Sequence, residues 1–223
     1  MKNIFTSLLA FARISDSAQS AQMPQTLDPK SIIFSVPTLS NDIAPTELVK
    51  YSPTAADLVF HEDEWSQIEF LPESQLPEVQ RLLTEYKPFE QQHRLEYGWR
   101  EVYVRKINRI SVTQNTTPLK QLETTLGVTS QPAPFLSSSG SVLGQVQNGF
   151  SFLVGSGITL YGYVSGQSIP VLGVIVENNS DNMALINTFV TLNAESGLIL
   201  VDWISQQVLV SVTASGQVDV WQP

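Results

Sequence analysis

Two histidine–glutamate pairs are the residues of this chain best suited to chemistry. Its only two histidines each stand three residues before a glutamate, as His61 with Glu64 and His93 with Glu96. Imidazole nitrogens and carboxylate oxygens suit zinc, iron and manganese, so one hypothesis is a metal-dependent enzyme in which the two pairs meet in space. The spacing makes a chelating pair only on a helix, whereas His61 falls where we expect the end of a strand.

Aromatic and charged side chains gather around the same two places and suggest a binding surface instead. Tryptophan, tyrosine and arginine dominate the energetic hot spots of protein–protein interfaces. The alternative is ordinary structure, in which residues 62–64 form a solvated turn between two strands and the aromatic rings pack in the core. The candidate binding residues are Glu62, Asp63, Trp65, Tyr97, Trp99, Arg100 and Tyr103.

Other common catalytic patterns are missing from the sequence. The chain has no cysteine, which excludes thiolate catalysis and cysteine-ligated metal sites. No serine stands in a G-x-S-x-G elbow. The one G-x-G, at residues 155–157, is not followed by a helix that could hold a phosphate. We therefore expect a protein that uses no catalytic residue and no cofactor.

The charge of the chain limits its partners. The net charge is −9, and the 12 lysines and arginines form no basic run. Binding to a phosphate backbone requires clustered basic residues, so we do not expect nucleic acid as a partner. No stretch reaches the ~18 apolar residues of a membrane-spanning helix. The expected partner is another protein or a second copy of the chain.

The N-terminal segment, residues 1–28, allows two interpretations. Lys2 followed by a short apolar run resembles the start of a signal peptide, but Arg13 interrupts the run and no good cleavage site follows. The other interpretation is an amphipathic helix, because Ile4, Leu8 and Phe11 fall on one face. The helix is favoured, which predicts a cytoplasmic protein. An exported protein with a cleaved segment is the alternative.

A change of composition divides the rest of the chain. Lys120 is the last basic residue, and no histidine follows it either. This change predicts an acidic α+β unit at residues 29–128 and a β-rich unit without basic residues at 148–223. Residues 129–147, rich in proline, serine and glycine, are expected to form a linker between them.

Residue patterns give the elements of each unit. The first unit is predicted to hold strands at 56–60 and 65–70, a helix at 72–86 that ends before Pro88, a long strand at 99–112 and a helix at 117–127. The second is predicted to hold glycine-separated strands and a meander at 198–204, 207–213 and 217–223, while 182–193 suits a strand or a helix. The fold class is α+β, a mixed α/β N-terminal unit followed by a mostly antiparallel β C-terminal unit.

The composition of the second unit bears on function. Natural sheets protect exposed edge strands with charged residues, lysine above all, and this unit has no lysine to place there. Its edges must then be covered by the first unit, by another subunit or by the chain itself. We therefore expect a non-catalytic protein-binding or assembly component, either of the inhibitor or immunity type or a structural subunit.

Overall fold

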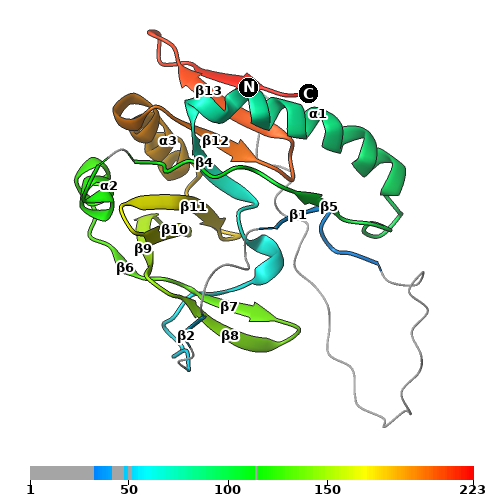
Figure 1. Ribbon diagram of the computed structural model, residues 1–223, viewed down its shortest axis with the longest axis horizontal. Coiled ribbons are helices and arrows are strands. Elements are labelled where there is room, and N and C mark those ends of the chain that lie inside the picture. The colour runs from blue at the N-terminus through cyan, green and yellow to red at the C-terminus, as the bar shows by residue number, and fades with distance from the viewer. Residues whose placement is uncertain (1–32, 42–47, 50–51, 114) are drawn as a thin grey trace.

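The computed structural model has an α+β fold, which confirms the predicted class (Figure 1). It describes residues 33–41, 48–49, 52–113 and 115–223. The amphipathic segment predicted at residues 1–28 lies outside these ranges. Three helices belong to the described residues: α1 (Leu76–His93), α2 (Pro118–Leu126) and α3 (Asn182–Ser196).

An antiparallel sheet forms the centre of the molecule. In the described part of the chain it has eight strands, in the order β14-β13-β12-β4-β11-β10-β9-β6. From one edge to the other, their bounds are Val218–Trp221, Gln207–Val212, Leu198–Asp202, Ile68–Pro72, Ser168–Val176, Ile158–Ser165, Gly149–Gly155 and Gln131–Pro132. The last three segments of the chain thus form the predicted meander, β12 to β14.

Two smaller sheets pack beside it. One has the order β2-β8-β7-β3 and contains Leu48–Val49, Ser141–Val146, Phe135–Ser138 and Val59–His61. The other pairs β1 (Thr38–Ser40) with β5 (Tyr103–Arg105) in parallel. Residues 129–147, for which the sequence predicts a linker, therefore hold β6, β7 and β8.

Strand β4 joins the two predicted units. It comes from residues 29–128, yet it lies between β11 and β12, which both come from residues 148–223. Its side chains alternate between two buried faces, with Phe70 in one apolar cluster and Leu71 in another. Strand β12 does the same with Leu200 and Val201, as its unbroken apolar sequence predicts.

Helices and the four-stranded sheet bury the two faces of the main sheet. Helices α2 and α3 cover one face, where Leu122 and Phe189 join Phe152 and Leu160 in the largest cluster. Helix α1 covers the β12–β13 part of the other face through a cluster that includes Leu83 and Trp203. The four-stranded sheet covers the β10–β11 part of that same face. Figure 1 shows α1 at the upper right, and α2 and α3 on the left.

Helix α1 corrects the predicted helix end at Pro88. The helix continues through Pro88 to His93. Its last turns are held by ring packing, because the Phe89 ring centroid lies 5.4 Å from that of Tyr103 and 4.2 Å from that of His93. These contacts offset the hydrogen bond that a proline removes from a helix.

The structure corrects one further prediction and decides another that the sequence left open. Of the long strand predicted at 99–112, only Tyr103–Arg105 is a strand. The ambiguous segment 182–193 is helical as part of α3. The Asp181 carboxylate caps its first turn by accepting a hydrogen bond from the Met183 backbone N–H, and Gly197 ends it in the left-handed conformation.

Helix α2 confirms the prediction at 117–127. Pro118 occupies its first turn, and Gly127 ends it with a φ of 67°. The Glu123 carboxylate on this helix accepts hydrogen bonds from the backbone N–H and the hydroxyl of Ser130, which lower the pKa of Glu123 to about 2. The carboxylate therefore fixes the chain that leaves the helix.

This pKa gives a first testable prediction. Because the folded-state pKa of Glu123 lies below its ordinary value of 4.5, the stabilisation is complete above pH 4.5 and is lost as the pH falls towards 2. A carboxyl-carbon NMR titration should place the Glu123 midpoint near pH 2, and the thermal midpoint of Glu123→Gln should approach that of the wild type over the same interval. A Glu123 midpoint near 4.5 would contradict the assignment.

Candidate functional site

The structure places the two histidines on different elements. His61 is the last residue of β3, where its Nδ1 accepts a hydrogen bond of 3.2 Å from the Asp63 backbone N–H. His93 is the last residue of α1, and its Nδ1 lies 3.6 Å from a carboxylate oxygen of Glu101. Glu64 and Glu96 are both exposed. Among the described residues, no three His, Asp or Glu side chains lie close enough to hold a metal ion.

The acidic segment forms the predicted turn between two strands. Residues Glu62–Glu64 make a single 3₁₀ turn between β3 and β4. Glu62 and Asp63 are partly exposed, and the Asp63 carboxylate lies 3.4 Å from His61 Nδ1. Trp65 follows the turn directly, and the chain then enters β4 in the main sheet.

Trp65 is a core residue. Its side chain is 2% exposed, and its ring lies in the cluster between the four-stranded sheet and the main sheet. The ring stacks on Phe60 at 6.3 Å between centroids and contacts the Tyr161 ring at 5.0 Å. The next residue, Ser66, has a φ of 53°, and its backbone N–H donates to the Tyr161 hydroxyl. This geometry removes Trp65 from any surface of the folded chain.

Tyr97, in contrast to Trp65, is highly exposed. The turn that follows α1 closes through a hydrogen bond of 2.9 Å from the Leu95 N–H to the Gly98 carbonyl. Gly98 has a φ of 81°, and a Cβ there would lie 2.4 Å from the Phe34 carbonyl oxygen. Only glycine allows both this conformation and this approach. The turn is thus held against residues 33–34, with the Tyr97 side chain 76% exposed.

The residues after this turn lie beside the segment that leads into β1. Trp99 and Phe34 exchange two backbone hydrogen bonds, of 2.9 and 3.0 Å. Trp99 is partly buried and Arg100 is exposed. Tyr103 turns under α1, where its ring lies 5.6 Å from that of Tyr86. Burial and the charge of Glu85 raise the pKa of Tyr103.

The β1–β5 pair separates an inner face from an outer face. Its register sets Thr38 against Tyr103, Leu39 against Val104 and Ser40 against Arg105. The outer pair is more exposed, since Val104 is 51% exposed, whereas Arg105 is 2% exposed. We call the group of Ile33, Phe34, Tyr97 and Val104 the β1–β5 apolar surface. Val104 comes from the outer face of the pair, Tyr97 from the turn, and Ile33 and Phe34 from the segment before β1 that the turn contacts.

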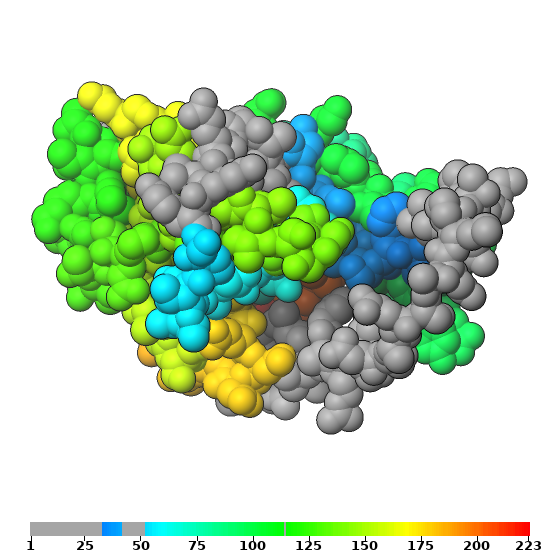
Figure 2. Space-filling model, turned by 90° about the horizontal axis from the view of Figure 1, so that it is seen from below, coloured from blue at the N-terminus to red at the C-terminus, as the bar shows by residue number. Residues whose placement is uncertain are grey.

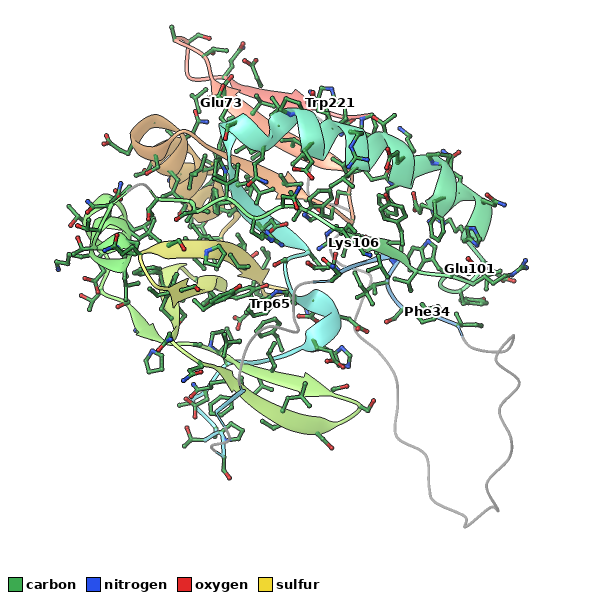
Figure 3. The ribbon with its side chains drawn as sticks, viewed as in Figure 1. Phe34, Trp65, Glu73, Glu101, Lys106 and Trp221 are labelled. Atoms are coloured by element: carbon green, nitrogen blue, oxygen red, sulfur yellow. The ribbon has the colours of Figure 1, made fainter. Side chains whose placement is uncertain are left out.

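Charged residues border this surface. Figure 3 shows Phe34 and Glu101 near each other, beyond the C-terminal end of α1. Three exposed basic residues and two exposed acidic residues make up the border, although the whole chain carries a net charge of −9. They are Arg94, Glu96, Arg100, Glu101 and Lys106. The surface is therefore apolar at its centre, and its border lacks the acidic excess of the chain as a whole.

A buried polar network supports the surface from beneath. Arg105 donates to the Thr38 hydroxyl and the Gln67 side-chain oxygen, both at 3.1 Å, and to the Ser66 carbonyl at 2.5 Å. Its guanidinium also lies over the Trp203 ring, 4.9 Å from the centroid. These contacts attach β5 to β1, to the two residues just before β4 and to the residue just after β12. The β1–β5 apolar surface therefore stands on a rigid base.

Sequence reasoning named one residue of this surface, Tyr97, and one of its border, Arg100, as binding residues. It identified Tyr97, Trp99, Arg100 and Tyr103 as one group. The structure exposes Tyr97 and Arg100, leaves Trp99 partly buried and packs Tyr103 under α1. Sequence reasoning missed Ile33, Phe34 and Val104, although the alternation of Tyr103, Val104 and Arg105 in a strand sets Val104 on the face opposite to its two neighbours. Glu62, Asp63 and Trp65 belong to a different place, the turn between β3 and β4.

Comparison with known proteins finds no relative of this chain. No protein-family model matches the chain, and neither the curated proteins nor the solved structures contain a significant match. None of the helices in the described ranges has the length and apolar character needed to cross a membrane.

Proposed function

We propose that this chain is a non-catalytic protein-binding component and that it binds its partner through the β1–β5 apolar surface. The observation that carries the proposal is the concentration of exposed apolar side chains. Ten large apolar side chains are exposed among the described residues. Four of them come from neighbouring segments: Val104 from β5, Tyr97 from the turn after α1, and Ile33 and Phe34 from the segment before β1 that this turn contacts. Exposed apolar residues are ordinary when scattered, whereas a group bordered by charges marks an interaction site.

The geometry of the surface suits binding in two ways. It presents aromatic rings, the side chains that contribute most to interface energies. Its backbone is also fixed, by the Gly98 turn on one side and by Arg105 beneath. A fixed surface loses little conformational entropy when it binds, so more of the contact energy appears as affinity.

A paired set of variants tests the proposal. Tyr97→Ser with Val104→Ser removes two exposed apolar side chains from the surface, and Met183→Ser with Val142→Ser removes two from other elements. The tagged proteins are used to capture partners from native cells, with quantitative mass spectrometry. We expect the wild type and the control to recover one stoichiometric partner. Recovery of this partner by the Tyr97–Val104 variant should fall at least tenfold, because two hot-spot residues together contribute about 2 kcal/mol or more to the binding free energy.

Two measurements complete the experiment. The thermal midpoints of both variants must match that of the wild type, which excludes unfolding as the cause of a loss. Light scattering of the purified protein shows whether the stoichiometric partner is a second copy of the chain. Equal recovery of the partner by both variants would reject this surface. A strictly monomeric protein that captures nothing would reject the proposed function.

A further inference from the structure

A groove separates the turn before β3 from one end of the main sheet. It has a volume of about 430 Å³ and is bounded by residues 55–58, by the segment 131–134, by side chains of β8, β9 and β10, and by Glu177, the residue that follows β11. Figure 2 shows residues 52–58, in cyan, beside the green β6–β8 segment on the face seen from below. The groove shares no residue with the β1–β5 apolar surface.

Hydrogen bonds fix the walls of this groove. The Gln145 side chain donates to the Ala133 carbonyl at 2.5 Å, and the Ser151 hydroxyl donates to the Pro132 carbonyl at 2.8 Å. The Phe135 N–H donates to the Leu58 carbonyl at 2.8 Å, which ties the two sides together. The groove is thus formed before any ligand arrives, and its volume falls within the range of ordinary ligand sites.

The lining joins apolar surface to negative charge. Leu58, Leu153 and Pro134 supply apolar contacts, and Leu153 is 54% exposed there. Asp57 and Glu177 supply two carboxylates, and no basic residue is present among the described residues that line the groove. The Thr54 N–H and hydroxyl donate to Asp57 and lower its pKa, so this carboxylate stays ionised at neutral pH.

The chain on one side of the groove limits how a ligand can bind. Strand β6 is the edge strand of the main sheet, and Pro132 within it and Pro134 after it have no backbone N–H. Proline on an edge strand prevents another strand from adding to the sheet. The two prolines therefore favour a ligand that engages the groove through its side chains over one that adds a strand to β6.

We propose that this groove binds a lysine or arginine side chain presented by an extended segment of a partner protein. The aliphatic stem of such a side chain packs on apolar surface, while its cationic head pairs with carboxylates. Leu58 and Leu153 offer apolar surface for the stem, and Asp57 and Glu177 offer carboxylates for the cationic head. This inference goes beyond the proposed function, because it names a second site and the chemistry of what occupies it.

A peptide titration tests the proposal with the full chain. The probe is N-acetyl-Ala-Arg-Ala-amide, added to ¹⁵N-labelled protein, and the matched probe carries norleucine in place of arginine. We expect the arginine peptide to shift the amide resonances of Leu58, Leu153 and Glu177, and to bind at least tenfold more tightly than the norleucine peptide. Raising the salt concentration should weaken the binding, because the carboxylates are accessible to solvent.

Variants separate the groove from general acidity. Asp57→Asn with Glu177→Gln should weaken binding of the arginine peptide about tenfold, as the loss of two partly exposed ion pairs would. The asparagine keeps the oxygen that accepts from Thr54, so the turn is retained. Asp219→Asn with Glu195→Gln, at two exposed acids outside the groove, should leave binding unchanged. Equal binding of both peptides, unchanged binding in the groove variant, or no shift at millimolar peptide would each overturn the proposal.

Discussion

Replacing Trp65 by alanine is expected to lower the free energy of unfolding by about 3 to 5 kcal/mol, the usual cost of removing a large buried ring. The ring is 2% exposed and contacts Phe60 and Tyr161 between two sheets, so its loss leaves a cavity that the surrounding strands cannot close. A typical domain is stable by 5 to 15 kcal/mol, so the variant should be close to unfolding. Urea denaturation followed by fluorescence or circular dichroism measures the change.

Trp65→Phe is the matched control. The indole Nε1 of Trp65 is buried and has no hydrogen-bond partner among the described residues, so phenylalanine removes no bond and keeps most of the ring contacts. We expect Trp65→Phe to lower the free energy of unfolding by less than half as much as Trp65→Ala does. If Trp65→Ala instead kept the wild-type midpoint but lost a partner, the residue would belong to a binding surface and not to the core.

The second large effect is expected at Glu69. Its carboxylate is fully buried, pairs with Arg109 and accepts a hydrogen bond of 2.8 Å from the Trp203 indole N–H. Replacing Glu69 by alanine removes a carboxylate that pairs with the Arg109 guanidinium in a buried site. Breaking a buried ion pair from one side costs about 3 to 5 kcal/mol. The loss should appear as a lower denaturation midpoint at neutral pH.

Two comparisons show whether burial causes this loss. Glu85 pairs with Arg81 on α1, where both side chains are about half exposed, so Glu85→Ala should change stability by no more than about 1 kcal/mol. The double variant Glu69→Leu with Arg109→Met should be more stable than Glu69→Ala, because it removes both charges of the pair. Equal costs for Glu69→Ala and Glu85→Ala would show that the Glu69 pair is solvated in solution.

Local sequence signals predicted those features that depend on neighbours along the chain. The acidic residues 62–64 mark a turn because they separate two apolar runs, and the structure has that turn. Pro118 and Gly127 mark the two ends of a helix because one lacks an N–H and the other adopts a positive φ. The unbroken apolar run at 198–201 marks a strand buried on both faces, which β12 is.

Tertiary contacts decided the features that the sequence left open. Trp65 and Tyr97 have similar neighbours, acidic residues and a histidine, yet one is in the core and the other is 76% exposed. The difference lies in what each precedes, because Trp65 leads into the central strand of a sheet, whereas Tyr97 sits at the tip of a turn. The helix also continues through Pro88 because of a tertiary contact, since the rings that hold the last turns of α1 include that of Tyr103, which lies beyond the helix.

The central place of β4 also governs the order in which the molecule can assemble during synthesis. Ribosomes add about 5 to 20 residues per second, so β12, the neighbour on one side of β4, emerges roughly ten seconds after β4 itself. Until then the backbone of β4 has no partner on that side, and the apolar side chains of Ile68–Pro72 have no β12 to pack beside. A chain that stops before residue 198 lacks β12 and cannot complete its sheet.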